Sequence, residues 1–263
     1  GGGGGGSYVD KRTNLTVYNC YGMNRTALSA LIRRARVDAI VFDIQDVGAR
    51  FYTYIWTMYD LLGAAADAAR VDAPFPFLVL DRPNPLSGTA VRGPMNPTHT
   101  SFVGRANIPL MHGLTVGELA RLFWGEFLHS DNDEHRGRPA RIDGSPLVNV
   151  SVVAMRGWSR SMDWESTNLP WVLASPNMPS LDTVRVYPGM CLLEGTTMSE
   201  GRGTTRPFNM VGAPYLGWQF SAALRQKQET REKLGRAAQV LYREAFFTPT
   251  FSKWVGNLSS GVD

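Results

Sequence analysis

The fold follows from residues 39–81, which read AIVFDIQDVGARFYTYIWTMYDLLGAAADAARVDAPFPFLVLD. Two short apolar runs, residues 39–42 and 77–80, lie at the two ends of this stretch. Between them, apolar side chains recur at helical spacing from residue 54 to residue 70. A strand, a helix and a second strand over this length predict a βαβ unit, whose strands are parallel, adjacent and buried on both faces.

Further helices and strands extend this unit in both directions. Residues 26–36 have helical character, and a helix is expected to begin at Thr115, because Thr115 and Glu118 fit a capping box. Residues 147–155 alternate like a strand, and residues 226–245 have the pattern of a charged amphipathic helix. The alternation of strands and helices predicts an α/β fold.

Three other segments are not expected to form regular elements. Residues 131–144 are polar and rich in glycine, which predicts an exposed loop. Residues 175–214 are rich in proline, glycine and threonine and show only weak periodicity. The glycine run at residues 1–6 has low complexity, so we interpret it as a linker, a tag or a sequence artefact.

Composition excludes several classes of function. The net charge of +4 comes without a clustered basic stripe, so nucleic acid is not an expected partner. No stretch approaches the roughly 18 apolar residues of a membrane span. Two cysteines and four histidines show no zinc-ligand spacing, and no glycine motif has a phosphate-binding pattern. We therefore expect neither a metal nor a cofactor.

Polar side chains follow both apolar runs of the βαβ unit. Ligands bind at the carboxyl ends of parallel strands in open α/β sheets, so this edge is a candidate site. The candidates there are Asp43, Gln45, Asp46 and Arg50 after the first run, and Asp81, Arg82 and Asn84 after the second. The competing interpretation is that Asp81 pairs with Arg82 or Arg50 and only holds the loops together.

A third polar cluster occupies residues 194–208, which include Glu194, Glu200 and Arg202. A glycosidase needs acidic side chains for proton transfer and charge stabilisation, and an arginine can hold a substrate carboxylate. A mobile loop without a ligand is the plainer alternative. His112, before the helix expected at Thr115, is a candidate acid/base, and Asn177 stands in a proline-bounded turn.

These motifs, taken in order, resemble one family, the NamZ-type exo-β-N-acetylmuramidases. The matching segments are residues 42–54 (FDIQDVGARFYTY), 81–85 (DRPNP), 101–104 (SFVG), 112–119 (HGLTVGEL), 175–179 (SPNMP), 194–208 and 247–252 (FTPTFS). The resemblance extends from about Ser7 to Lys253. Long matches in the same order over this distance are specific.

The resemblance implies a Rossmann-like subdomain, a second and smaller α/β subdomain, and an active site in the cleft between them. We place the first subdomain at residues 7–150 and the second at residues 151–263. It also implies an enzyme that removes N-acetylmuramic acid from the non-reducing ends of peptidoglycan fragments. The expected ligand is thus a muropeptide or muramyl sugar, and the expected location is extracellular or periplasmic.

Within that resemblance, we assign Glu194 and Glu200 as acidic groups at the scissile bond and Arg202 as the partner of the lactyl carboxylate. The remaining candidates would shape the substrate pocket: Asp43, Gln45, Asp46, Arg50, Asp81, Arg82, Asn84, His112 and Asn177.

The resemblance also predicts that this chain is a fragment. The family's Pro-Glu-His-Gly motif, whose glutamate the resemblance assigns as acid/base, would precede Ser7, and a further α/β portion would follow Lys253. The alternative function is a non-catalytic carbohydrate-binding or scaffold protein that lacks this glutamate. A nucleotide-binding α/β protein is a third possibility, but it would need the phosphate fingerprint that the sequence lacks.

Overall fold

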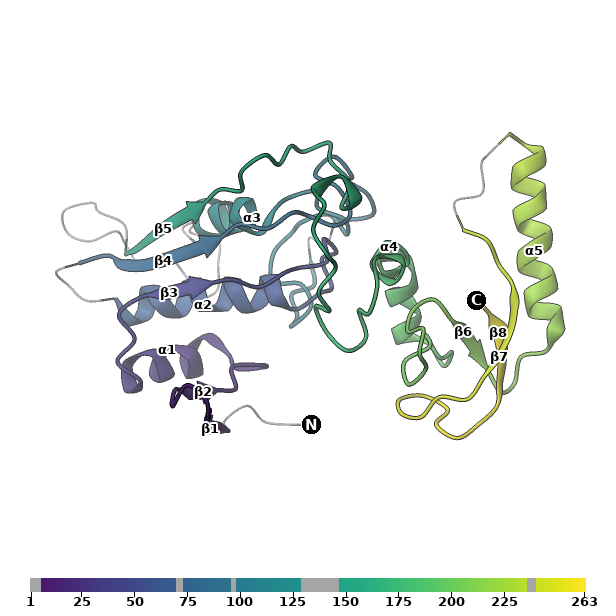
Figure 1. Cartoon of the computed structure of the whole chain (residues 1–263), viewed down its shortest axis with the longest axis horizontal. Coiled ribbons are helices and arrows are strands. Elements are labelled where there is room, and N and C mark those ends of the chain that lie inside the picture. Colours follow the sequence, from purple (N-terminus) through teal and green to yellow (C-terminus); the bar gives the residue numbers. More distant parts are fainter. Residues whose placement is uncertain (1–5, 70–72, 96–97, 129–146, 236–239) are drawn as a thin grey trace. The chain divides into compact units, whose positions relative to one another are not determined.

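A computed structural model describes residues 6–69, 73–95, 98–128, 147–235 and 240–263. The chain divides into two compact units, Gly1–Asn168 and Leu169–Asp263, called unit 1 and unit 2 below (Figure 1). Each unit contains helices and a sheet of three strands, as the α/β class predicts.

A parallel sheet forms the centre of unit 1, with the strand order β3-β4-β5. Its strands are β3 (Ile40–Phe42), β4 (Phe75–Leu80) and β5 (Val148–Val153). Val41 lies opposite Leu78 in the β3–β4 pair, and β5 pairs with β4 along its whole length. The predicted βαβ unit is therefore confirmed.

Helices pack against this sheet and complete its core. They are α1 (Arg25–Arg34), α2 (Tyr54–Ala68) and α3 (Val116–Leu122), which continues into a π-helical turn (Phe123–Phe127). The predicted apolar face of α2 is buried, with Ile55, Met58 and Leu62 fully covered. The capping box at Thr115 is also confirmed, because its hydroxyl accepts from the Glu118 amide while the Glu118 carboxylate accepts from the Thr115 amide.

The expectation that the strands are buried on both faces is wrong for the part of the sheet that the structure describes. In β4, Phe75, Phe77 and Val79 are buried, while the alternate side chains are less covered. Val41 in β3 and Val153 in β5 are 58% and 53% exposed. Successive side chains point to opposite faces of a strand, so one face carries the core and the other remains accessible.

Two smaller features complete unit 1. An antiparallel hairpin of β1 (Ser7–Val9) and β2 (Thr16–Tyr18) precedes α1, and its side chains are exposed. A short 3₁₀ turn (Glu165–Thr167) lies near the end of the unit. The predicted loop at residues 131–144 lies outside the described residues.

Unit 2 is built around an antiparallel sheet with the strand order β6-β8-β7. Its elements are α4 (Leu181–Met190), a 3₁₀ turn (Cys191–Gly195), β6 (Val211–Ala213), α5 (Trp218–Lys233), β7 (Glu244–Phe247) and β8 (Ser259–Val262). In Figure 1, α5 runs alongside this sheet. The helix α4 was not expected within residues 175–214, because Pro188 inside it interrupts the helical pattern.

A single helix over residues 226–245 is wrong. The helix α5 begins at Trp218 and ends at Lys233, and residues 244–247 form β7 instead. Gly235 explains this end, since it has φ +72° and its amide donates to the Glu232 carbonyl at 2.9 Å. A glycine in the left-handed region commonly terminates a helix in this way.

The division between the units differs from the predicted boundary after residue 150. That position lies inside β5, whose hydrogen bonds to β4 keep residues 148–153 in unit 1. The compact units separate after Asn168, a residue with φ +55° that ends the 3₁₀ turn.

Two glycines of unit 2 should respond oppositely to alanine substitution. A Cβ at Gly261 in β8 would lie 1.9 Å from the Val211 carbonyl oxygen, whereas a Cβ at Gly189 in α4 meets nothing within 4 Å. We expect Gly261→Ala to lower the free energy of unfolding by about 1–3 kcal/mol, because the added methyl group overpacks the sheet. We expect Gly189→Ala to raise it by about 0.5–1 kcal/mol, because alanine favours the helix. Urea denaturation of both variants tests this, and similar effects in both would contradict the close β6–β8 approach.

Candidate functional site

The loops that follow β3 and β4 are joined at the carboxyl edge of the sheet. Gln45 bridges them, since its Nε2 donates to the carbonyls of Asp46 (2.7 Å) and Pro83 (3.0 Å). Gly48 has φ +81°, and a Cβ there would lie 2.2 Å from the Asn84 side-chain oxygen. Asn84 in turn donates to the Leu114 carbonyl at 3.0 Å. The sequence prediction that these two loops lie together is thus correct.

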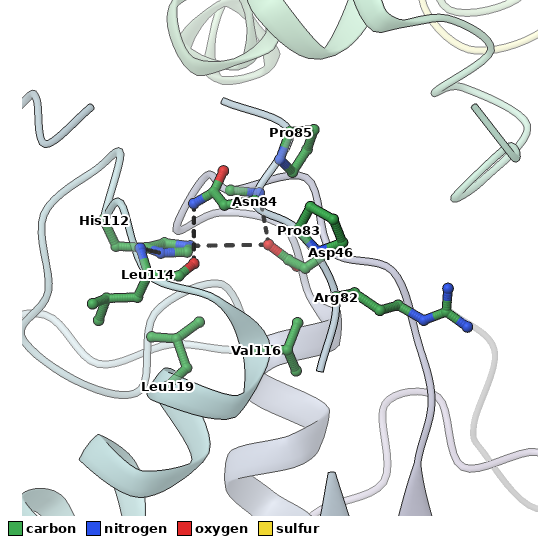
Figure 2. A pocket seen from close by; sticks show the side chains of 10 residues that line it. Asp46, Arg82, Pro83, Asn84, Pro85, His112, Leu114, Val116 and Leu119 are labelled. Carbon is green, nitrogen blue, oxygen red and sulfur yellow. Dashed lines mark hydrogen bonds and ion pairs between the residues drawn. The ribbon is translucent and has the colours of Figure 1, made fainter. Parts of the chain in front are cut away.

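A small pocket opens between these loops and the start of α3 (Figure 2). Its polar lining comes from Asp46, Arg82, Asn84 and His112, and its apolar lining includes Leu119. The depression between these side chains measures about 170 Å³, and this volume includes space that is open to solvent. The lining side chains pack too closely in this structure to leave room for a water-sized group between them.

Asp46 and His112 face each other in this pocket, and each is only 4% exposed. The His112 Nδ1 accepts from the Leu114 amide at 3.2 Å, which leaves the proton of a neutral ring on Nε2. The distance from Nε2 to the Asp46 Oδ2 is 3.9 Å, and Oδ2 accepts from the Gly48 amide at 2.8 Å. Among the described residues, neither His112 Nε2 nor Asp46 Oδ1 has a hydrogen-bond partner.

Burial shifts the pKa of both side chains toward their neutral forms. Desolvation raises the pKa of Asp46 to about 7, although the amides of Gly48 and Val47 oppose this shift. Desolvation also lowers the pKa of His112 to about 4. Buried polar groups without partners are rare because they cost free energy, and groups of perturbed pKa gather at functional sites, so this pair remains a candidate site.

Other candidates at this edge have contacts that hold the loops in place. The Asp81 carboxylate accepts from the Gly117 amide (2.8 Å) and the Thr115 hydroxyl (2.9 Å), which anchors the start of α3. The buried Arg50 guanidinium donates to the carbonyls of Pro94 (2.8 Å) and Ile108 (2.6 Å). These contacts hold the loops together, as the structural alternative predicted. Asp81 contacts Arg82 through the Arg82 backbone amide, which donates to its carboxylate at 3.0 Å, rather than through the guanidinium.

Asp43 and Arg82 form an exposed ion pair with each other, with the Arg82 Nε 2.9 Å from the Asp43 Oδ1. In Figure 2 the Arg82 side chain extends away from His112. Both side chains are exposed, so a ligand can reach them, and a solvated ion pair of this kind contributes little to stability.

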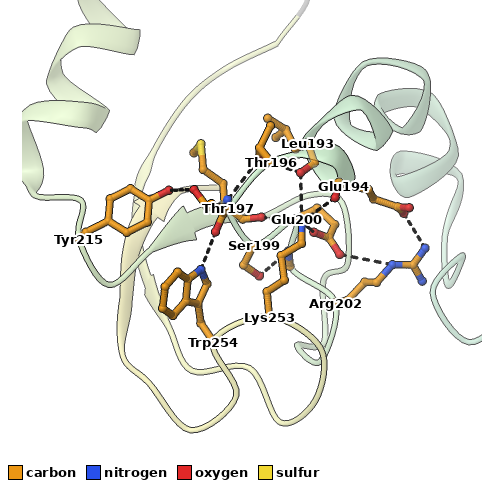
Figure 3. Close-up of polar contacts among 12 residues, drawn as sticks. Leu193, Glu194, Thr196, Thr197, Ser199, Glu200, Arg202, Tyr215, Lys253 and Trp254 are labelled. Atoms are coloured by element: carbon orange, nitrogen blue, oxygen red, sulfur yellow. Dashed lines mark hydrogen bonds and ion pairs between the residues drawn. The ribbon is translucent and has the colours of Figure 1, made fainter. Parts of the chain in front are cut away.

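The third predicted cluster lies in unit 2 and has Glu200 at its centre (Figure 3). Glu200 is 2% exposed, and its carboxylate contacts the Lys253 Nζ at 3.0 Å and the Arg202 Nε at 3.4 Å. Arg202 also donates to the Glu194 carboxylate at 2.7 Å and lies over the Phe208 ring, 4.9 Å from its centroid. Glu194 and Arg202 are partly exposed, so a ligand can reach them.

Lys253 was not a candidate from the sequence, yet it organises this cluster. Its ammonium group donates to the carbonyls of Leu193, Glu194 and Met198 at 2.9–3.1 Å as well as to Glu200. The only available signal was a single lysine between aromatic residues in the segment FSKW, and this pattern has no specific chemistry. Its partners are mostly backbone atoms, which a residue pattern cannot reveal.

Neutral groups and glycines surround the ion pairs. Burial raises the pKa of Cys191 to about 11 and also raises the pKa of Tyr187, so both are uncharged near neutral pH. Gly201 and Gly203 have φ near +80°, and a Cβ at either position would lie within 3 Å of a backbone oxygen. The loop around Arg202 therefore packs tightly against residues 206–210 and 250–251.

Asn177 is partly exposed in a turn that the Met178 amide closes by donating to Ser175 at 2.9 Å. The structure thus gathers most candidates into two clusters, one at the sheet edge of unit 1 and one around Glu200 in unit 2. Within the described residues, no group of three metal-ligating side chains occurs, and no helix is long and apolar enough to cross a membrane.

Solved structures of similar proteins share this arrangement of α/β elements. The crystal structure of a DUF1343 family protein from Bacteroides fragilis is 32% identical, with a TM-score of 0.75. A second protein of that family from the same organism is 29% identical, with a TM-score of 0.66. Both matches cover 97% of this chain and 59% of the solved chain. The chain is thus a two-subdomain α/β protein of this structural class.

Sequence comparisons name the family. The N-terminal model of the exo-β-N-acetylmuramidase NamZ matches residues 3–182, and the C-terminal model matches residues 185–263. The chain belongs to the NamZ family, as its motifs predicted. It is 45% identical over 258 residues to the peptidoglycan β-N-acetylmuramidase NamZ of Bacillus subtilis (strain 168). That match covers 98% of this chain, which spans 55% of the length of the relative.

The opposite pKa shifts of Asp46 and His112 predict opposite effects on stability. Because the pKa of Asp46 is raised in the folded protein, its contribution to stability is lost as the pH rises from about 4 to 7. Because the pKa of His112 is lowered in the folded protein, its contribution to stability is lost as the pH falls from about 6.5 to 4. Relative to the native chain, His112→Gln should lose stability with rising pH in this window and Asp46→Asn should gain it, each by about 1 kcal/mol per pH unit. Urea unfolding at pH 4.5 and 6.5 measures both slopes. Slopes equal to that of the native chain would contradict the burial effect.

Removing Lys253 should leave Glu200 buried without its nearest cation. We expect Lys253→Met to lower the free energy of unfolding by about 3 kcal/mol, and Lys233→Met, at an exposed position of α5, by less than about 0.5 kcal/mol. The double variant Glu200→Gln/Lys253→Met should be more stable than the sum of the single effects predicts, since the charge is then removed as well. Additive losses in chemical denaturation would show that the two residues do not interact.

Proposed function

We propose that this chain forms the substrate site of an exo-β-N-acetylmuramidase, a glycosidase that removes N-acetylmuramic acid from the non-reducing ends of peptidoglycan fragments. The observation that carries the proposal is the 45% identity to the Bacillus subtilis peptidoglycan β-N-acetylmuramidase over 98% of this chain. The substrate would be a muropeptide or a muramyl sugar. Peptidoglycan lies outside the cytoplasmic membrane, so we also propose an extracellular or periplasmic location.

The sheet-edge pocket supports a role in substrate binding. It lies at the carboxyl ends of β3 and β4, the edge at which open α/β sheets bind ligands. It also combines a protonatable carboxyl group of raised pKa with a neutral histidine, and perturbed groups of this kind gather at functional sites.

The Glu200 cluster suggests different roles for its two carboxylates. Glu200 is enclosed by Lys253 and Arg202, so we assign it to holding the loop and the guanidinium in place. Glu194 is partly exposed, so it is the better placed of the two to contact a glycosidic bond. The sequence assigned both Glu194 and Glu200 to the scissile bond. We propose that only Glu194 acts there as the acid/base.

A second candidate function is carbohydrate binding without catalysis. The observation that favours it is the ion pairing of both Glu194 and Glu200, because a carboxylate held by cations is a poor proton donor. A glycosidase and a non-catalytic binding protein would bind the same muramyl ligand, but only the glycosidase would hydrolyse it.

Release of 4-nitrophenol from 4-nitrophenyl N-acetyl-β-muramide tests the proposal, with calorimetric binding of methyl N-acetyl-β-muramide in parallel. We expect hydrolysis of this glycoside and at least roughly 100-fold less of the N-acetyl-β-glucosaminide. Glu194→Gln should lower kcat by about 100-fold or more if Glu194 transfers a proton, whereas Asp67→Asn, at the ion pair between α1 and α2, should not. Binding without hydrolysis would support the second candidate, and neither binding nor hydrolysis would overturn both.

Arg202 should contribute to the preference for muramic acid over glucosamine. The two sugars differ by a lactyl ether that bears a carboxylate. Arg202 is a partly exposed cation of the cluster, and a guanidinium can hold a carboxylate through two hydrogen bonds. A hydrogen bond to a charged group is worth about 1.5–3 kcal/mol, so Arg202→Ala should weaken muramide binding by about 10- to 150-fold. Binding of both sugars to both proteins by calorimetry tests this. Equal losses for the two sugars would show that Arg202 only orders the loop with Glu194 and Glu200.

A further inference from the structure

Two exposed aromatic side chains of unit 2, Tyr215 and Trp254, are held at fixed positions beside the Glu200 cluster (Figure 3). Tyr215 is 57% and Trp254 is 36% exposed, and their rings lie 5.9 Å apart at an angle of 73°. Thr197 holds the polar end of both. Its hydroxyl forms a hydrogen bond with the Tyr215 hydroxyl at 2.7 Å, and its carbonyl accepts from the Trp254 indole N–H at 2.7 Å. This aromatic pair therefore offers preorganised ring surface to a ligand.

The backbone around Trp254 is strained. Trp254 has φ +60° and Ser252 has φ +73°, a region that bulky side chains rarely adopt. Such strain persists only where surrounding contacts enforce it, and it gathers at active sites and ligand clamps. Here the enforcing contacts are those of Lys253, whose ammonium group binds the Glu200 carboxylate and three carbonyls. The same anchor thus fixes the indole ring and the Glu200 cluster.

Exposed surface continues along the chain from Glu194 to the aromatic pair. Residues 194–197 are all exposed, and Thr197 is the residue that binds both rings. Three residues of extended chain span at most about 11 Å, so Thr197 lies within this distance of Glu194. That reach is comparable to the length of a disaccharide. A ligand with its glycosidic bond at Glu194 can therefore contact the pair with the neighbouring sugar.

An uncharged pyranose ring fits the chemistry of the aromatic pair. The faces of a β-linked amino sugar carry apolar C–H groups, which pack favourably on aromatic rings, and its hydroxyls project from the edge. In the part of the chain that the structure describes, the hydroxyls of Thr197 and Tyr215 use one of their two protons on each other. The second proton can be donated to a sugar oxygen.

We propose that Tyr215 and Trp254 form a stacking site for the N-acetylglucosamine ring that follows the terminal muramic acid in a peptidoglycan fragment. The proposal rests on the proposed function, because it takes Glu194 as the residue at the scissile bond. The charged cluster then binds the acidic sugar and the aromatic pair binds its uncharged neighbour. The second sugar consequently adds affinity that depends on the two rings.

Binding of three ligands to the full chain tests the proposal. They are the methyl β-thioglycoside of N-acetylmuramic acid, the thio-linked disaccharide in which N-acetylglucosamine follows it, and methyl N-acetyl-β-glucosaminide. Sulfur replaces the scissile oxygen, so neither muramyl ligand is hydrolysed. By calorimetry the native chain should bind the disaccharide about 3- to 10-fold more tightly than the muramyl monosaccharide. In proton NMR spectra the C–H signals of the second sugar should move upfield, because they lie over aromatic rings.

Protein variants show whether the two rings supply this gain. Trp254→Leu and Tyr215→Leu should each reduce the gain from the second sugar to less than about 2-fold and leave the affinity for the monosaccharide within about 2-fold. Trp254→Phe retains an aromatic ring and should keep part of the gain. Tyr8→Leu, at a tyrosine of β1 that is 65% exposed, is the matched control and should bind like the native chain.

The outcomes separate this proposal from the proposed function. Equal binding of monosaccharide and disaccharide to the native chain would overturn the stacking site while the muramide affinity stands. An undiminished gain in Trp254→Leu would place the second sugar elsewhere, and parallel losses for both ligands would show that the ring only holds the loop. Either result overturns the proposal. Binding of the glucosaminide that depends on Trp254, without any muramide binding, would support the stacking site and contradict the proposed function. Failure of all three ligands to bind would overturn both.

Discussion

Close contact between Gly48 and Asn84 is the constraint on which the sheet edge depends. Any side chain at Gly48 would overlap the Asn84 amide, whose oxygen would lie 2.2 Å from the added Cβ. This contact brings the loop after β3 against the loop after β4 and lets Asn84 donate to the Leu114 carbonyl. The same Leu114 binds the His112 ring through its amide, so the position of His112 beside Asp46 follows from a backbone arrangement that only glycine allows at residue 48.

Two different solutions to burying charge appear in the two units. In unit 2, Glu200 is surrounded by two cations, and the ammonium group of Lys253 is itself satisfied by three carbonyl oxygens. Among the described residues of unit 1, Asp46 and His112 have no ionic partner close enough for a hydrogen bond, and burial shifts the pKa of each toward its neutral form. The first arrangement fixes a loop, and the second leaves two buried polar atoms without a hydrogen-bond partner among the described residues.

Sequence patterns predicted what depends on periodicity and chain order. The parallel strands, α2 and the Thr115 capping box follow from local patterns, and the meeting of the two loops follows from the rule that parallel strands end at one edge. Contacts between distant residues could not be predicted in the same way. The spacing of residues in the sequence shows neither the contacts of Lys253 with carbonyl groups nor the burial that raises the pKa of Asp46. The helix α4 was not predicted because the proline inside it is atypical of a helix.

The contacts of Lys253 have a consequence for the order in which the chain folds during synthesis. The carboxyl edge of unit 1 uses residues from 43 to 117, and its sheet is complete when β5 pairs with β4. Glu200, in contrast, meets its ammonium partner 53 residues later in the chain. Domains generally fold in order as they leave the ribosome, so the loop that bears Arg202 remains without its anchor until residue 253 has emerged. The sheet edge of unit 1 is therefore complete before the Arg202 loop is in place.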